Sequence, residues 1–492
     1  MITLQKTRYA LCFIVSTLCF LHAQAQIDPP LRLELESTKD QQDYKFASLS
    51  HLGVAVFYQS AILSVDTAQW VFIQYDTNLA RTHIFKIKLP NLCQYLAADF
   101  SDEKLYLFLQ KPAYKKDTLK NYLLEWNLLT HNFELFDLQN YKFPYLSSIK
   151  VAEDYLFITV DGQKTKSIIY YNYKTHTKQA VQFIEDEIVS IESFCINTLQ
   201  KETCFCMFLK NKTGARAELF VTDYAGNIKE RKPFPFYEDL IYNSAQIAFV
   251  GKDSLLLVGG YSNIKDKKPK GCYSGVYSIS FANHRFSDIN TYSFGALLEK
   301  DSTLNTKYLA EPNIAMNGHI TQSNGKVFAI VDVFYPEYQY TSSSYRSFGY
   351  YGYDPPTQVF SGFRFLNAYI LEFTPYGSLL NEWYFPITNV LTQSLYNLVN
   401  IFQDKEENSL FYYVYRNEII SQFMNGKQVL GAKAAIPVAL TDKTDILEYS
   451  SNIAMQHWYN NSFLLSGYQY IKNAQRGKGK RYVFFLNKLI CE

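Results

Sequence analysis

Three histidines occupy one position of a repeated sequence pattern, and they are the first residues to consider for acid–base or metal chemistry. His131, His176 and His284 each lie in a short polar segment between two apolar stretches. Turns in three separate repeat units would keep the rings apart, so we interpret these histidines as turn residues. The remaining histidines form no pair at a metal-binding spacing such as His-x-x-x-His. We therefore predict no metal site and no cofactor.

The cysteines that follow residue 25 are the next candidates for chemistry. Cys195 and Cys204 flank the polar, hairpin-like stretch 196–203, so a disulfide from Cys195 to Cys204 or Cys206 is one prediction. Buried free thiols on strands are the alternative, because free cysteine is among the most buried residue types. Alternation along a strand would place the sulfurs of Cys204 and Cys206 on one face.

Sequence signatures of catalysis are missing from the chain. The sequence contains no Gly-rich phosphate loop, no Gly-x-Ser-x-Gly nucleophile elbow and no Cys-x-x-Cys pair. The formal net charge of +2 gives no argument for nucleic acid as a partner. We predict no catalytic residue, and we favour a protein that is not an enzyme.

The first 25 residues have the three parts of a secretory signal peptide. Lys6 and Arg8 precede an apolar run over residues 9–21, and Ala23-Gln24-Ala25 is a small-x-small cleavage site. The apolar run is shorter than the roughly 20 residues that cross a bilayer as a helix, and no later window is long enough. The sequence thus predicts cleavage before Gln26 and no transmembrane segment afterwards. We expect a secreted, periplasmic or cell-surface protein.

One apolar strand type recurs along the rest of the chain. Its first apolar residues are Val54, Leu105, Tyr155, Cys204, Leu255, Val327, Leu410 and Phe463, and five of the seven intervals between them are 49 to 53 residues long. Most of these runs are followed by a second strand pair, whose turn carries one of the three histidines or Gly226, Gly377 or Asn425-Gly426. Several are preceded by another short strand. Four short strands in about 50 residues is the size of a propeller blade.

The sequence therefore predicts an all-β fold, a single β-propeller over residues 26–492 with about eight four-stranded blades, or seven as the alternative. The last unit is one strand short, and the alternating segment Leu31 to Glu36 could supply that strand and close the ring. Over nearly all of the mature chain the sequence resembles β-propeller repeat proteins in general, and no specific family among them. Asp253 to Tyr261 resembles the double-glycine strand of a kelch repeat.

Charge is distributed unevenly between the predicted connections. The loops between the second and third strands are rich in cations, among them Lys267, Lys268, Lys478 and Arg481, whereas the turns between the first and second strands lean acidic. In a propeller these two kinds of connection emerge on opposite faces. We predict one positive face that binds a polyanionic or glycan ligand through summed weak attraction. Solubilising surface lysines are the alternative interpretation.

An aromatic-rich insertion at residues 334–365 breaks the repeat. Tyrosine mixed with serine and glycine is typical of contact loops, because a rigid ring gives contact area at low entropic cost. The insertion could cap the central channel from the cationic side. The candidate ligand-binding residues that it contains are Tyr338, Tyr340, Tyr345, Arg346, Tyr350, Tyr351 and Tyr353.

Together these patterns favour an exported, non-catalytic binding or scaffold propeller with an unidentified protein or glycan partner, and we expect it to be a monomer. The alternative is a polysaccharide-acting hydrolase or lyase with an acidic site at the central channel. Fold alone cannot distinguish the two, because function depends on the sites that a fold carries.

Overall fold

The computed structural model describes most of the chain after residue 30. The described residues are 31–37, 43–113, 119–138, 146–161, 166–182, 188–211, 214–235, 237, 239–250, 254–263, 274–293, 315–323, 326–341, 357–426, 428–442, 444–473 and 479–491. They form two compact units, of which unit 1 comprises Met1–Leu92 with Phe402–Glu492 and unit 2 comprises Cys93–Ile401. None of the helices among the described residues could span a membrane.

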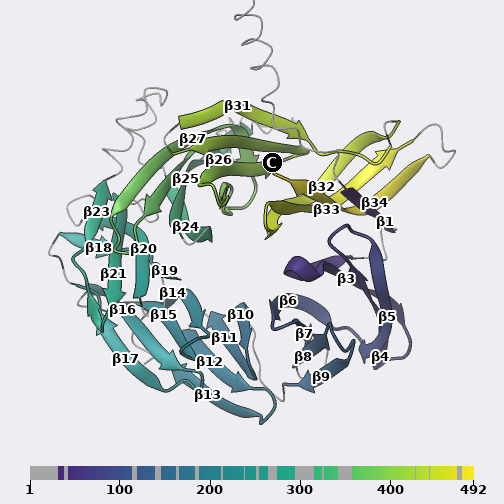
Figure 1. Cartoon of the computed structure of the whole chain (residues 1–492), viewed down its shortest axis with the longest axis horizontal. Helices are drawn as coiled ribbons and strands as arrows, with labels where there is room; N and C mark the ends of the chain where they lie inside the picture. Colours follow the sequence, from purple (N-terminus) through teal and green to yellow (C-terminus); the bar gives the residue numbers. More distant parts are fainter. Residues whose placement is uncertain are drawn as a thin grey trace, which may run out of the picture. The chain divides into compact units, whose positions relative to one another are not determined.

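Unit 2 contains five consecutive antiparallel sheets, which Figure 1 shows as successive groups of arrows. The first sheet has β6(Gln94–Ser101), β7(Lys104–Lys111), β8(Lys120–Asn127) and β9(Phe133–Asp137). The second has β10(Leu146–Ala152), β11(Tyr155–Asp161), β12(Lys166–Asn172) and β13(Thr177–Gln182). The third has β14(Ile188–Asn197), β15(Glu202–Asn211), β16(Gly214–Asp223) and β17(Ile228–Pro233). The fourth has β18(Leu240–Tyr242), β19(Gln246–Phe249), β20(Ser254–Asn263), β21(Gly275–Ala282), β22(Arg285–Phe286) and β23(Asn290–Ser293). The fifth has β24(Ala315–Ser323), β25(Lys326–Thr341), β26(Thr357–Phe373) and β27(Leu379–Thr392).

Unit 1 contains the other three sheets and one short 3-10 helix, η1(Ser50–Leu52). One sheet has β2(Lys45–Ser48), β3(Val54–Ile62), β4(Thr67–Tyr75) and β5(Arg81–Pro90). The next has β28(Asn400–Gln403), which spans the boundary of the units, with β29(Asn408–Tyr415), β30(Glu418–Asn425) and β31(Gln428–Pro437). The last has β32(Ile446–Tyr459), β33(Ser462–Lys472), β34(Lys480–Ile490) and β1(Leu31–Ser37).

The all-β fold with eight propeller blades confirms the prediction from the repeat. Strand β1 pairs antiparallel with β34, from Leu31 opposite Lys488 to Ser37 opposite Tyr482, so the N-terminal strand completes the C-terminal blade as expected. Each apolar run identified in the sequence lies in the second strand of its blade. These strands are deeply buried, as in β7, where Leu105 to Leu109 are all at most 4% exposed.

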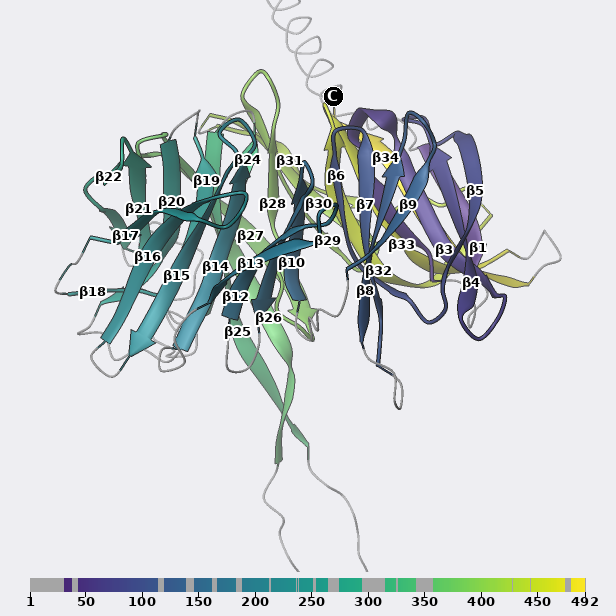
Figure 2. The ribbon, with the colours of Figure 1, turned by 90° about the horizontal axis from the view of Figure 1, so that it is seen from below.

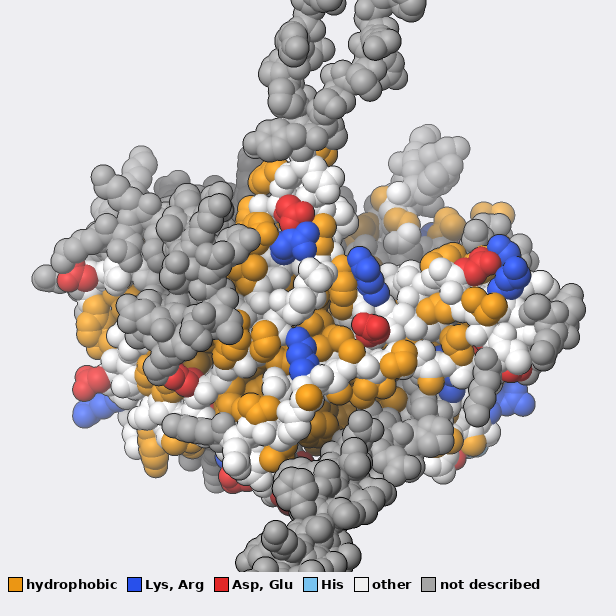
Figure 3. Space-filling model, turned by 90° about the horizontal axis from the view of Figure 1, so that it is seen from above, with side chains coloured by type: hydrophobic (Ala, Val, Ile, Leu, Met, Phe, Trp, Pro, Cys, Tyr) orange, Lys and Arg blue, Asp and Glu red, His pale blue; other side chains and the backbone are white. Residues whose placement is uncertain are grey.

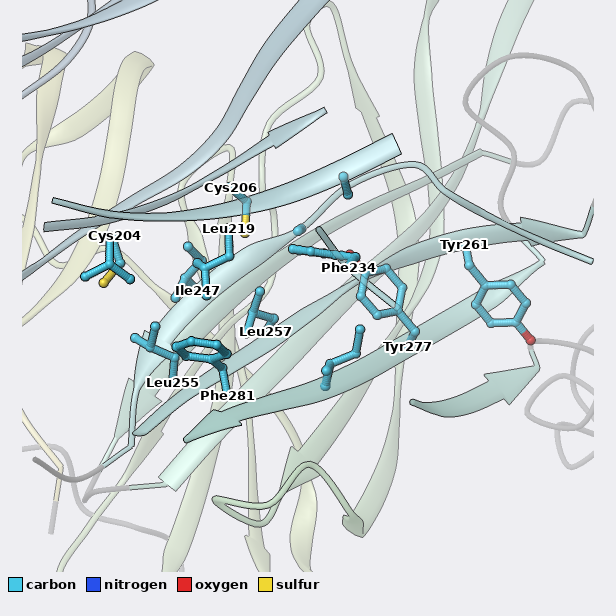
Figure 4. Packing of buried hydrophobic residues seen from close by; sticks show 14 residues of the cluster. Cys204, Cys206, Leu219, Phe234, Ile247, Leu255, Leu257, Tyr261, Tyr277 and Phe281 are labelled. Carbon is cyan, nitrogen blue, oxygen red and sulfur yellow. The ribbon is translucent and has the colours of Figure 1, made fainter. Parts of the chain in front are cut away.

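Neighbouring blades pack through the apolar faces of their sheets. Between the blades of β15 and β20, the side chains of Cys204, Cys206 and Leu219 meet Ile247 and Leu257 in one buried cluster (Figure 4). Cys204 and Cys206 therefore share a face, as the alternation predicted. Stacking of this kind buries both apolar faces of a sheet that could not bury them alone.

The turn between the third and fourth strands explains the recurring histidines. His131, His176 and His284 have φ angles of 58°, 57° and 62°. Gly226 and Gly377 lie in the equivalent turn of two other blades, and both have a φ of 86°. All five residues are in the left-handed region, which closes a tight hairpin. The turn role predicted for the three histidines is thus confirmed.

The blade with the kelch-like segment has six strands, because its first strand is divided into β18 and β19 and its fourth into β22 and β23. At the break, the backbone of Ser244 comes so close to β20 that a Cβ on Gly259 would lie 1.9 Å from Ser244 O. Glycine at this position therefore permits the close approach of the two backbones.

Strands β25 and β26, with 16 and 17 residues, are the longest strands of their blade, in which β24 has 9 residues and β27 has 14. Strand β24 pairs with β25 only as far as Phe334, and β27 pairs with β26 only from Phe363. Beyond these points the two strands continue as a twisted pair, which Figure 2 shows projecting past the rest of unit 2. The described parts of the predicted insertion, 334–341 and 357–365, thus continue two strands of the blade.

Candidate functional site: an aromatic ribbon

We call residues 334–341 of β25 and 357–365 of β26 the ribbon. Its strands are paired from Phe334 opposite Phe365 to Thr341 opposite Thr357. A two-stranded ribbon in water is marginally stable unless its side chains pack. The ribbon meets this requirement with a row of aromatic rings on one face and an ion pair on the other.

The aromatic face runs from the core of the blade to solvent. Phe334 packs against Phe365 and Phe363, with ring centroids 5.7 and 5.6 Å apart. Phe363 contacts Phe360 at 5.1 Å, and Phe360 contacts Tyr338 at 5.7 Å. Exposure rises along this row from 1% for Phe365 and 3% for Phe334 to 40% for Phe360 and 50% for Tyr338. The buried rings therefore anchor two exposed ones, and Figure 3 shows hydrophobic side chains along the projecting ribbon.

A β-bulge places Phe360 in this row. Glu337 pairs with Gly362 and Tyr338 pairs with Phe360, so Ser361 is the extra residue. Without the bulge, alternation would put Phe360 on the face opposite to Phe363. The bulge is fixed by the Ser361 hydroxyl, which donates to Glu337 O at 2.9 Å, and by Gly362, where a Cβ would lie 2.5 Å from Thr392 O.

The opposite face carries the charges of the ribbon. The Arg364 guanidinium forms a two-pronged ion pair with Glu337, in which Nη2 lies 3.0 Å from Oε1. This hydrogen-bonded pair lowers the pKa of Glu337 below its usual value. Val359, 47% exposed, lies on the same face beside Gln339. Since Glu337 and Arg364 neutralise each other, the described ribbon presents aromatic and polar groups and no net charge.

The root of the ribbon contains a buried carboxyl group. Asp332 is 0% exposed, and its Oδ2 accepts a 2.8 Å hydrogen bond from the backbone N–H of Leu398. Burial raises the pKa of Asp332 to about 7, and backbone N–H groups oppose that rise. This contact ties the strand that carries the ribbon to the connection that follows β27.

Only part of the candidate binding set from the sequence falls in the described ribbon. Tyr338 is an exposed member of the aromatic face, and Tyr340 lies opposite Gln358 in the strand register. The other insertion residues, Tyr345, Arg346, Tyr350, Tyr351 and Tyr353, and the lysines Lys267, Lys268 and Lys478 lie outside the described residues. A cap over the channel would have to include residues 342–356, which are also outside them.

Arg481, the remaining candidate cation, lies within an ion-pair network in unit 1. Its Nη2 is 2.5 Å from Asp445 Oδ2 and 3.2 Å from Glu34 Oε2, and its side chain is 16% exposed. Lys480 beside it pairs with Glu448 at 3.1 Å. The structure places Arg481 and Lys480 at the start of β34 and not in the loop before it. Their acidic partners offset part of the positive charge expected there, and a ligand role for Arg481 stays a prediction.

Cys195 and Cys204 face each other across the strand pair of β14 and β15. Both are free thiols in the structure, with Cys195 Sγ 3.6 Å from Cys204 O. Burial raises the pKa of the Cys195 thiol well above its usual value. A buried thiol of this kind is a poor nucleophile. The disulfide between the two residues stays a prediction.

Sequence reasoning missed Phe360, Phe363 and the Glu337–Arg364 pair. The signal that could have found them is the alternation of apolar and other residues over Phe363 to Phe365, which is typical of a strand. The bulge at Ser361 interrupts this alternation, and it hid the contribution of Phe360.

The described residues do not bring together three or more His, Cys, Asp or Glu side chains in a cluster that could hold a metal ion. The described ribbon offers exposed aromatic rings and amide groups, which can contact a ligand through stacking and hydrogen bonds.

No family model matches this chain, and no curated protein does. Solved structures match this chain at low similarity. The Dos1 propeller is 8% identical with a TM-score of 0.40, over 94% of this chain and 96% of its own. A eukaryotic initiation factor is 12% identical with a TM-score of 0.39, over 92% and 98%. The β-propeller domain of the Trilobed protease from Pyrococcus furiosus is 9% identical with a TM-score of 0.36, over 80% and 93%. Similarities of this size carry no argument about ligand or activity.

Proposed function

We propose that this protein is an exported, non-catalytic binding propeller that recognises a glycan through the aromatic face of its ribbon. The observation that supports the proposal most strongly is the row of anchored rings that ends in Phe360 and Tyr338, which are 40% and 50% exposed. Buried neighbours hold these rings in place, so binding loses little side-chain entropy. The predicted signal peptide supports export to a compartment where such ligands occur.

The chemistry of the ribbon favours a sugar chain over a strongly charged ligand. The electron-rich face of an aromatic ring attracts the polarised C–H groups of a pyranose ring. Gln358, which is exposed and shares the aromatic face by alternation with Phe360, offers an amide donor and acceptor suited to hydroxyl groups. The only charges of the described ribbon, on Glu337 and Arg364, form an internal pair. Cationic loops outside the described residues would add affinity for acidic sugars.

The test is an array of neutral and acidic glycans probed with the purified protein and with a shortened variant. In the variant, residues 338–361 are replaced by Asn-Gly, a dipeptide that closes a two-residue hairpin. This change keeps Glu337 opposite Gly362 and retains the ion pair to Arg364. The two proteins should have similar melting temperatures, because the removed residues lie beyond the four-stranded part of the blade.

Glycan binding that is present in the intact protein and lost in the variant supports the proposal. Equal binding by both proteins would place the glycan site elsewhere. If neither protein bound a glycan and the ribbon captured a protein partner, the ligand would be a protein surface and not a glycan. The mass of the exported protein tests the predicted removal of the signal peptide. It should equal the mass of a chain that begins at Gln26.

A further inference from the structure

The turn between β3 and β4 in unit 1 presents aliphatic side chains to solvent. Ile62 is 64% exposed, Leu63 is 48% exposed and Val65 is 86% exposed. Leu92, which follows β5, is 48% exposed. We call these four residues the aliphatic turn. Single exposed apolar residues are normal on a soluble protein, but a contiguous group indicates a contact surface.

Hydrogen bonds hold the aliphatic turn in one conformation. The backbone N–H groups of Leu63 and Ser64 both donate to Thr67 O, at 2.9 and 3.0 Å. Asn91, only 6% exposed, donates from Nδ2 to Val65 O at 3.1 Å. The exposed side chains thus project from a fixed backbone, and burying them would not require ordering of the chain.

Leu92 adds a second, independent observation. Its φ angle is 65°, in the left-handed region that a residue with a Cβ disfavours. The side chain is nearly half exposed, so burial in the core does not compensate for this conformation. This turn conformation places an exposed aliphatic group beside Asn91.

Two lysines lie on the outer strand next to the turn. Lys86 and Lys88 are both exposed on β5, opposite Val71 and Gln69 of β4. Because they are two residues apart, their side chains leave the same face of the strand. The exposed carboxylate of Asp66 in the turn offsets one of these charges, which leaves the group net positive.

We propose that the aliphatic turn docks this protein onto an anionic lipid bilayer, independently of the ribbon. Protein–protein interfaces of standard size use about 20 to 30 residues a side, whereas this site is a single tight turn. A bilayer accepts a few projecting aliphatic side chains, and the lysines can reach its phosphate groups. The positive charges of Lys86 and Lys88 favour an anionic bilayer over a neutral one.

The test is flotation of the purified protein with two kinds of vesicle, one of phosphatidylcholine alone and one that also contains phosphatidylglycerol. The protein should float with the anionic vesicles, and the binding should weaken as salt is raised. Ile62→Ser and Val65→Ser should each reduce the binding about tenfold, the effect of losing one buried aliphatic side chain. The double variant Lys86→Gln/Lys88→Gln should reduce binding to anionic vesicles alone.

Leu199→Ser is the matched control, because Leu199 is 78% exposed in the turn between β14 and β15. It should leave flotation unchanged, and all variants should keep the melting temperature of the unmodified protein because the altered side chains are exposed. Failure of the unmodified protein to float with anionic vesicles would overturn the proposal. So would an equal loss in the Leu199 variant, or retention of binding in the Ile62 and Val65 variants.

Discussion

The backbone N–H of Leu398 donates a 2.8 Å hydrogen bond to the buried carboxyl group of Asp332. Burial raises the pKa of this carboxyl to about 7. It is therefore neutral in the folded protein under mildly acidic conditions and becomes a buried anion as the pH rises. This group lies in the strand that carries the ribbon, so its titration should change the stability of that blade.

Asp332→Asn should remove a pH dependence from the stability of the protein. The pKa of an unfolded aspartate is about 3.9, so between pH 4 and 7 the folded state binds more protons and raising the pH destabilises it. A rise in pKa from about 3.9 to about 7 corresponds to a decrease of about 4 kcal/mol in the free energy of unfolding. Asparagine keeps Oδ1 as an acceptor for Leu398 and does not ionise.

Thermal melts of both proteins at pH 5 and pH 8 measure this effect. The stability of the native protein relative to the variant should be lower at pH 8 than at pH 5. The other titratable groups contribute equally in both proteins and cancel in this comparison. An unchanged difference would show that Asp332 does not titrate in this range.

Arg32→Ala should destabilise the closure of the C-terminal blade by about 3 to 5 kcal/mol, the cost of removing one partner from a buried charged network. The Arg32 side chain is 4% exposed and donates to Glu34 at 2.8 Å, Gln469 at 2.7 Å and Asn487 at 3.0 Å. Urea unfolding measures the loss. Lys480→Ala is the control, since its exposed ion pair with Glu448 should leave the urea midpoint unchanged. Equal midpoints for the two variants would mean that β1 is not held by Arg32.

The sequence was sufficient to predict the blades, because each second strand is an apolar run and each tight hairpin needs a left-handed residue such as His131 or Gly226. The pairing of β1 with β34 was also predictable, since an unfilled strand position and an alternating N-terminal segment are both visible in the sequence. The network around Arg32 was not, because its partners Gln469 and Asn487 are far away in sequence and meet only through strand register. The sequence showed that the insertion is rich in aromatic residues but not which rings lie together. A one-residue bulge at Ser361 decides which rings share a face.

Cys195 should form a disulfide with Cys204 in the exported protein, because the two residues are directly opposite in register. Trypsin cleaves after Lys201, between the two cysteines, so their peptides should remain joined until a reductant is added. Cys204→Ser should separate them, whereas Cys206→Ser should not. Alkylation of all these thiols before reduction would contradict the pairing.

Titration of a glycan selected on the array into two variants shows whether the aromatic face of the ribbon is the contact surface. Phe360→Ala removes a ring from the aromatic face, and Val359→Ala shortens a side chain of similar exposure on the opposite face, 47% against 40%. We expect an affinity about tenfold weaker for Phe360→Ala, typical of an aromatic contact residue, and an unchanged affinity for Val359→Ala. Equal affinities in both variants and the native protein would contradict this expectation.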